Sequence, residues 1–208
     1  MISQMNEQLR RIVVSGTIKE DSAAHFLEQI TALECIDMAK PISIYVDTYG
    51  GSIDAALLMY DAMKSCACPI VTIGIGKVMS AGVLLLAAGE NGNRFITQNT
   101  RVMIHQVSGG VIGSISEMET SVAEARRQQD VYVNILSSCT GMTKTKVLAD
   151  MQAETYMSAE EAVEYGIADK MVPTRKTTKK VTNKPKKANK KKAAKKKTKV
   201  KSREKQER

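Results

Sequence analysis

The sequence predicts an α/β domain with mainly parallel strands, followed by a disordered basic tail. Strand patterns, glycine-rich turns and helical patterns alternate over residues 1–172, an order typical of a parallel sheet covered by helices. Hydrophobic residues make up 43% of the chain and aromatic residues only 4%, so aliphatic side chains and methionines must fill the core. Residues 173–208 are rich in lysine and nearly free of large apolar side chains. We therefore expect one domain over residues 1–172 and a tail over residues 173–208.

The first half of the domain is expected to contain three strands, each followed by a helix. The first helix has apolar residues at helical spacing and begins after Asp21-Ser22, which can cap it. The third helix is apolar almost throughout, so we expect it to be buried. The expected strands are residues 11–16, 42–46 and 70–76, and the expected helices are residues 20–33, 53–63 and 80–88.

The second half is expected to contain two short strands and three helices. Ser116 and Glu119 form a capping box at the start of a long helix, and Gly141 ends it. Ser158 and Glu161 form a second capping box, at the start of the last helix. The expected strands are residues 95–96 and 102–105, and the expected helices are residues 116–138, 143–151 and 158–166.

The net charge of +9 is divided unevenly along the chain. Residues 173–208 contain 18 Lys and Arg and 2 acidic residues, so the tail carries +16 and the domain carries −7. Such a segment cannot bury enough apolar surface to fold, so we expect disorder. It is either a solubilising extension or a contact for a polyanion, such as nucleic acid, an acidic protein surface or a membrane surface. No aromatic residues interleave the lysines, which does not favour base stacking.

Several classes of protein are excluded or disfavoured by composition. No apolar run approaches the roughly 18–20 residues that span a bilayer. The polar segment from Met1 to Arg11 has no signal-peptide core, which favours a cytoplasmic location. The chain has only two His, and Cys66-Ala67-Cys68 has no second ligand pair, so free thiols are favoured over a metal site. It has no Walker A, dinucleotide or HExxH motif, so we expect no cofactor and no metal.

Two segments between a strand and a helix are candidates for a catalytic site. Gly50-Gly51 can adopt positive φ, and the following helix N-terminus can hold an oxyanion, although a plain tight turn is the favoured interpretation of an isolated Gly-Gly. Ser80 follows a buried strand and begins a buried helix, which is the setting of a nucleophilic serine. The full nucleophile-elbow pattern is not met, because Val78 stands where that pattern has Gly. Taken alone, Ser80 is more often a helix N-cap than a nucleophile.

A serine nucleophile needs a base, and His105 is the candidate. It lies at the end of the strand 102–105, whereas His25 lies on an early helix and is expected at the surface. A lone His at a strand end is more often structural. We expect the N–H of Ala81 to point toward the same space as the N–H of Gly51. The residues alone therefore define an α/β domain with a candidate serine site.

Four sequence blocks resemble those of the proteolytic subunit of Clp protease, ClpP, in the same order and with similar spacing. The resemblance covers about residues 11–172. It implies the family's fold, a ClpP/crotonase-like spiral of β-β-α units with a protruding handle helix. The blocks are Tyr49-Gly50-Gly51-Ser52, Val78 to Gly89, Arg101 to Gln106 with Gly109-Gly110, and Met157 to Asp169.

The resemblance assigns catalytic roles by position. Ser80 is implied as the nucleophile and His105 as the general base, and Gly51 and Ala81 as oxyanion-hole donors. The family's third triad residue is an Asp, and Glu154 occupies that position here. Glu can orient an imidazole as Asp does, but its extra methylene changes the reach. Asp150 is the nearest Asp, displaced by four positions.

The resemblance also implies substrates and partners. It implies an ATP-dependent serine endopeptidase acting on polypeptides inside two stacked heptameric rings, with an AAA+ unfoldase (a Clp ATPase) as partner. The segment before Arg11 is short for the family's axial segment, which bears on unfoldase docking. Extended substrate would lie along Gly50, Gln106, Gly109 and Gly110.

Three alternatives remain at this stage. A crotonase-type acyl-CoA enzyme shares the architecture, although that chemistry usually rests on carboxylates. An inactive or weakly active assembly protein could keep the fold and bind nucleic acid through its tail, because fold does not fix function. A phage-borne or otherwise divergent member of the family, such as a maturation protease, would also suit a basic tail.

Overall fold

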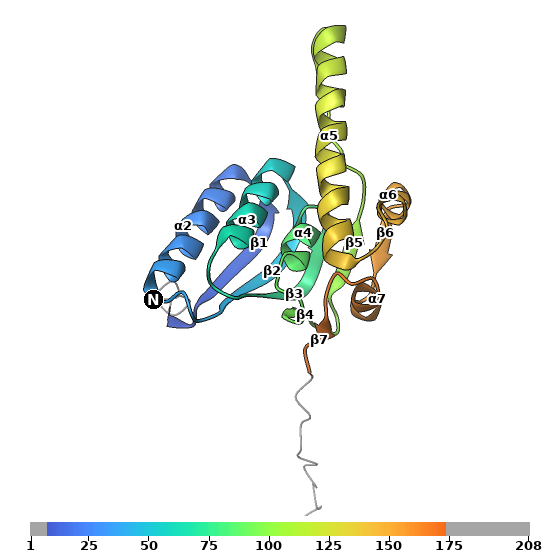
Figure 1. Ribbon diagram of the computed structural model, residues 1–208. Helices are drawn as coiled ribbons and strands as arrows, with labels where there is room; N and C mark the ends of the chain where they lie inside the picture. The colour runs from blue at the N-terminus through green and yellow to red at the C-terminus, as the bar shows by residue number, and fades with distance from the viewer. Residues whose placement is uncertain (1–7, 174–208) are drawn as a thin grey trace, which may run out of the picture. The chain divides into compact units, whose positions relative to one another are not determined.

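The computed structural model describes residues 8–173, in which strands and helices alternate as the sequence predicts (Figure 1). The strands are β1 (Arg11–Ile18), β2 (Ile42–Gly51), β3 (Ile70–Met79), β4 (Arg94–Ile96), β5 (Arg101–Ile104), β6 (Thr155–Met157) and β7 (Lys170–Met171). The helices are α2 (Glu20–Ile36), α3 (Ile53–Ser65), α4 (Gly82–Ala87), α5 (Ile115–Thr140), α6 (Lys144–Gln152) and α7 (Ala159–Glu164). Apart from Pro173, the expected tail lies outside the described residues.

The strands form one seven-stranded sheet whose main path runs β1-β2-β3-β4-β7. Beyond β4, the end of β3 pairs with β5, and β5 pairs in turn with β6. Every pair is parallel except β5 with β6. The expectation of a mainly parallel α/β domain is therefore confirmed. The two strands that the sequence pattern does not reveal, β6 and β7, are only three and two residues long.

Helices α2 and α3 lie side by side against the sheet (Figure 1). The inward side chains of α2 repeat at helical spacing, as expected from the sequence, and are Ala23, Phe26, Ile30 and Leu33. All six residues of α4 are buried, which confirms the expected buried helix. These helices and strands share one hydrophobic core. The carboxyl ends of β2, β3 and β5 are available to form a site.

Several element boundaries differ from those expected. β2 continues to Gly51 and β3 to Met79, so both strands extend further than their apolar runs. The helix expected from Ser80 begins at Gly82, and Ser80 lies in the turn before it. The capping box expected at Ser116 and Glu119 is wrong. Ser114 and Glu117 form it instead, because the motif S-x-x-E occurs in both registers and the earlier one starts the helix.

Helix α5 consists of an exposed first half and a packed second half. Its buried residues are Tyr132, Val133 and Leu136, all in the second half. The first half extends away from the sheet (Figure 1), and Gly141 at φ 76° ends the helix as expected. The handle helix implied by the family resemblance is therefore α5. Among residues 8–173, no helix combines the length and apolarity needed to cross a membrane.

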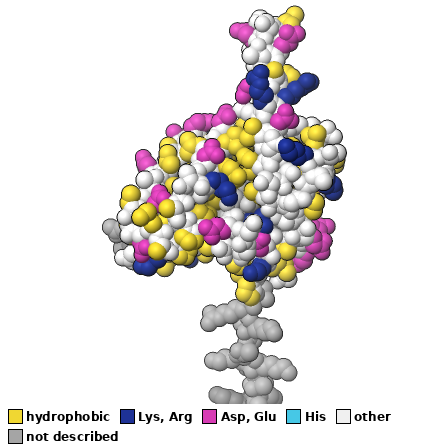
Figure 2. Space-filling model, in the orientation of Figure 1, with side chains coloured by type: hydrophobic (Ala, Val, Ile, Leu, Met, Phe, Trp, Pro, Cys, Tyr) yellow, Lys and Arg dark blue, Asp and Glu magenta, His cyan; other side chains and the backbone are white. Residues whose placement is uncertain are grey.

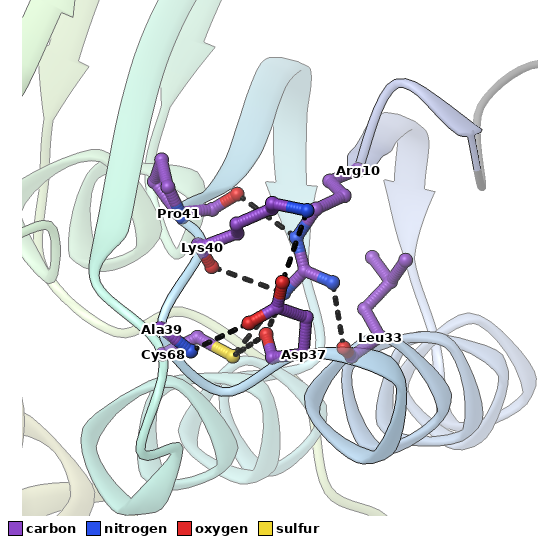
Figure 3. A network of polar contacts seen from close by, with 7 residues as sticks. All are labelled: Arg10, Leu33, Asp37, Ala39, Lys40, Pro41 and Cys68. Atoms are coloured by element: carbon purple, nitrogen blue, oxygen red, sulfur yellow. Dashed lines mark hydrogen bonds and ion pairs between the residues drawn. The ribbon is translucent and has the colours of Figure 1, made fainter.

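Two arginines connect distant parts of the domain. The Arg10 guanidinium donates to the carbonyl oxygens of Leu33 and Asp37, both at 2.8 Å, at the C-terminus of α2 (Figure 3). A cation beside these terminal carbonyls stabilises the negative end of the helix dipole. The buried Arg94 pairs with Asp169 and joins the start of β4 to the segment before β7. Burial acts to raise the pKa of Asp169, but hydrogen bonds from Arg94 outweigh it and hold that pKa below its ordinary value.

Candidate active site

Ser80 lies in a strained turn between β3 and α4. Its φ is 54°, a left-handed conformation that residues other than Gly seldom adopt and that clusters at functional sites. Three hydrogen bonds hold the turn. The Ser80 N–H donates to the Met103 carbonyl (2.8 Å), and the Ser80 carbonyl accepts from the Val83 N–H (3.0 Å) and the Tyr132 hydroxyl (3.1 Å). The backbone is thus held from β5, α4 and α5, which leaves the side chain free to face the cleft.

Strand register brings His105 to Ser80. β3 and β5 are parallel, and Met79 lies opposite Met103. Ser80 and His105 therefore both follow the carboxyl ends of neighbouring strands. The distance from His105 Nε2 to Ser80 Oγ is 2.8 Å, which is a hydrogen bond. Both residues are half-buried, so a substrate can reach them.

Gly50 and Gly51 end β2 beside the serine turn, and Gly51 lines the cleft. Their φ values are 97° and 150°, which favour Gly. A Cβ on Gly50 would lie 2.7 Å from Ser80 Cβ and 3.1 Å from the Ala81 nitrogen, so the two backbone segments lie against each other. The Thr48 hydroxyl accepts from the Gly50 N–H at 2.9 Å and fixes this segment. Close approach to the serine turn is thus the physical reason for Gly at position 50.

A cleft of about 260 Å³ opens beside the serine. Its lining includes Ser80, His105, Gly51 and Ala81, four of the residues that the sequence singled out. Ala81 is the N-cap of α4, where backbone N–H groups have no carbonyl within the helix to pair with. A reacting carbonyl in this cleft can therefore meet a hydroxyl, an imidazole and backbone donors together.

A second cavity of about 460 Å³ adjoins the first, since Gln106, Val107, Ser108 and Gln128 line both. Gly109 and Gly110, expected to bind substrate, line this second cavity and are exposed. Gln106 contributes to both cavities, whereas Gly50 supports the serine turn and lines neither. Three of the four expected substrate residues, Gln106, Gly109 and Gly110, thus line two adjacent hollows that the loop after β5 and helix α5 share.

The third triad position is less closely tied to His105. Glu154 is exposed, and its Oε1 accepts a hydrogen bond from the Tyr156 hydroxyl at 3.4 Å. The Asp150 carboxylate is engaged elsewhere, pairing with Lys146 and accepting from the Tyr165 hydroxyl at 3.0 Å. Within residues 8–173, neither acid hydrogen-bonds to the imidazole. The role of Glu154 therefore stays a prediction.

Three residues of the cleft were not predicted as functional. Tyr132 of α5 is buried and donates to Ser80, and burial raises its pKa, so the hydroxyl keeps its proton. Gln128 Nε2 donates to Asp54 Oδ1 at 2.9 Å and joins α5 to the start of α3 across the cleft. A tyrosine in the apolar stripe of a helix signals a buried hydroxyl that needs a partner. Nothing in the sequence indicates the pair of Asp54 and Gln128.

The described residues offer no group of three or more His, Cys, Asp or Glu side chains that could hold a metal ion. Cys66 and Cys68 are free thiols in this region, and burial raises the pKa of Cys66 to about 11. Neither thiol lines the cleft beside Ser80.

A serine hydroxyl that is hydrogen-bonded to a histidine imidazole, at the carboxyl edge of a parallel sheet, is the arrangement of a serine hydrolase. Comparison with known proteins narrows this class. The family model described as Clp protease matches residues 1–175. The chain is 37% identical over 174 residues to "ATP-dependent Clp protease proteolytic subunit 2" of Chlamydia pneumoniae, covering 84% of this chain and 86% of the relative.

A second relative agrees with the first. The subunit of the same name from Chlamydia trachomatis is 36% identical over 170 residues, covering 82% of this chain and 84% of the relative. The chain belongs to the Clp protease family, which confirms the family resemblance and the fold class implied by it. It is accordingly an enzyme of the serine endopeptidase class.

Proposed function

We propose that this protein hydrolyses peptide bonds of unfolded polypeptides, with Ser80 as nucleophile and His105 as general base. The observation that carries this proposal is the 2.8 Å contact between His105 Nε2 and Ser80 Oγ at the edge of a cleft. Family membership supports peptide hydrolysis over the acyl-CoA chemistry of the crotonase alternative. The Ser–His contact argues against an inactive assembly protein.

The proposed reaction proceeds through an acyl-enzyme. His105 Nε2 takes the proton from Ser80 Oγ as that oxygen attacks the scissile carbonyl carbon. Backbone N–H groups of Gly51 and Ala81 stabilise the oxyanion, and removing one such donor costs about 2.7–4 kcal/mol in comparable sites. His105 then gives the proton to the leaving amine. His105 Nε2 then takes a proton from the water that attacks the ester carbonyl, and gives that proton to Ser80 Oγ as the acyl–oxygen bond breaks. Glu154 is assigned to orient the imidazole.

Extended substrate is proposed to run through the two adjoining cavities. Gln106 lines both, and the exposed backbone at Gly109 and Gly110 lines the second. Exposed backbone N–H and C=O groups can pair with a peptide that adds as a strand. Such pairing binds the main chain and suits a peptidase that accepts many sequences.

We further propose that the enzyme assembles as two stacked heptameric rings and works with an AAA+ unfoldase, in the cytoplasm as the sequence predicts. The family typically forms oligomeric rings and works with Clp ATPases. The projecting half of α5 supports a contact with a second copy, because apolar side chains lie exposed among charged ones along it (Figure 2). The most exposed of these on the projecting half are Ile115 and Val122, and the exposed Ile112 lies in the segment just before the helix.

The basic tail is proposed to contact a polyanion. Its support is the charge of +16 over residues 173–208, opposite in sign to the domain. A chain ending after Pro173 should hydrolyse peptides normally but elute earlier from heparin at low salt. Equal retention of the two proteins would remove this part of the proposal.

The peptidase proposal is tested by hydrolysis of an internally quenched peptide and of an unfolded protein, with and without an ATP-driven unfoldase. Ser80→Ala and His105→Ala should each reduce kcat by about 10⁴-fold or more. Ser65→Ala, which removes an exposed hydroxyl on α3, is the matched control and should retain full activity. Hydrolysis that survives Ser80→Ala would contradict the assignment.

A further inference from the structure

The cleft beside Ser80 has an uneven charge. Its lining is Gly51, Ser52, Ile53, Asp54, Ser80, Ala81, His105, Gln106, Val107, Ser108, Gln128 and Tyr132. Among these residues Asp54 alone carries a permanent charge at neutral pH. Most of the others present hydroxyl, amide or backbone groups. A substrate side chain that enters this cleft therefore meets a largely polar wall with one negative charge, to which Ile53, Ala81 and Val107 add the apolar parts.

Asp54 is held in place from two sides. It occupies the first turn of α3, after the N-cap Ser52, where the helix dipole stabilises a carboxylate. Gln128 Nε2 donates to Asp54 Oδ1 at 2.9 Å, which ties the carboxylate to α5 across the cleft. Within residues 8–173, Asp54 Oδ2 has no hydrogen bond. One oxygen is thus fixed by the protein, and the other is free to accept from a ligand.

A second carboxylate adds to the negative potential. Hydrogen bonds from its own backbone and from the Ser52 hydroxyl hold the pKa of Glu20 below its ordinary value, so Glu20 is ionised at neutral pH. Ser52 lines the cleft, so Glu20 lies just behind its wall. The charge of Lys19 also lowers the pKa of Glu20, but less than the hydrogen bonds do. Arg126 lines the neighbouring cavity and not this one.

We propose that Asp54, oriented by Gln128, makes this cleft a subsite selective for a basic substrate side chain next to the scissile bond. This inference rests on the proposed function, because it names the substrate class of the same site. A lysine or arginine can extend past Ser80 and donate to Asp54 Oδ2. An acidic side chain in the same position meets like charge, and an apolar one leaves polar groups unpaired.

The test uses internally quenched peptides that differ only at a residue flanking the scissile bond, on either side, as Lys, Gln, Leu or Glu. In the unaltered enzyme at low salt, kcat/KM should be about tenfold higher for Lys than for Glu at one flanking position, with Leu below Lys. Asp54→Asn should reduce this ratio to nearly one, and Asp54→Lys should invert it. High salt should also reduce the ratio, because ions screen the attraction.

Asp61→Asn is the matched control, since Asp61 is an exposed acid on the same helix outside the cleft lining. It should leave the ratio of Lys to Glu unchanged. Cleavage of all peptides with no charge preference, or with a preference that persists in Asp54→Asn, would overturn this inference while the proposed function stands. Failure to cleave any of the peptides would overturn the proposed function and this inference with it.

Discussion

Replacing Gly50 by Ala should misplace the serine turn without unfolding the protein. The added Cβ would lie 2.7 Å from Ser80 Cβ and 3.0 Å from the Met79 carbonyl oxygen, whereas ordinary contacts begin at 3.4 Å. The two segments must therefore separate by roughly 0.7 Å, a distance that directly affects how Ser80 faces a bound carbonyl. The change leaves Ser80 and His105 chemically intact, so it tests position alone.

The expected magnitude has two parts. An Ala at φ 97° costs about 1–2 kcal/mol of folding free energy, because its Cβ crowds its own backbone. The displacement of the turn adds a loss of activity, since a misplacement of about 1 Å can cost a factor of about 100 in rate. We expect kcat/KM to fall by roughly 30- to 100-fold, equivalent to about 2–2.7 kcal/mol in the barrier.

Gly16→Ala separates these two parts. Gly16 has a similar φ of 77°, but a Cβ there would meet no atom within 4 Å. This variant should lose similar folding stability in urea and retain activity within about twofold. The measurements are peptide hydrolysis and the rate at which a fluorophosphonate labels each variant. Equal activity of Gly50→Ala and Gly16→Ala would refute the view that Gly50 positions the serine.

Four further substitutions test other contacts of the domain. Tyr132→Phe removes the hydroxyl that donates to the Ser80 carbonyl, so kcat should fall by about three- to tenfold with KM nearly unchanged; an unchanged kcat would mean that this bond does not position the turn. Glu154→Ala should reduce peptide hydrolysis by about 100-fold or more. Asp150→Ala should lower the stability of the fold and leave peptide hydrolysis largely intact. The reverse result would move the third triad role to Asp150. Asp169→Asn breaks the buried pair with Arg94 and should cost about 3 kcal/mol in urea unfolding at pH 7. Because the pKa of Asp169 is lower in the folded protein, this stabilisation is complete above the unfolded pKa of about 3.9 and disappears as pH falls through the folded-state value; a cost independent of pH below 4 would contradict it.

The existence and order of the main elements could be predicted from the sequence, but the strand ends at the site could not. β2 continues through Asp47 and Thr48 to Gly51, where polar residues and glycines interrupt the apolar run. Parallel pairing with β1 on one side and β3 on the other sustains the strand there. The short β6 forms in the same way, because it lies opposite β5. Both features depend on neighbours distant in the sequence.

The candidate site was predictable to different degrees. Ser80 and His105 each have several explanations when taken alone, and only the family resemblance brings them into one site. Their contact depends on the register that puts Met79 opposite Met103, which no local pattern encodes. The pair of Asp54 and Gln128 joins residues 74 positions apart and has no sequence signal. The strand register and the pair of Asp54 and Gln128 both join segments that meet only in the folded chain, so the local sequence does not predict them.

The central claim is that one serine hydroxyl, activated by one imidazole, performs the chemistry. Its most direct test is to label the purified protein with a fluorophosphonate and locate the adduct by peptide mass spectrometry. We expect a single adduct on Ser80, formed much more slowly in His105→Ala. An adduct on another residue, or equally fast labelling without the imidazole, would contradict the claim.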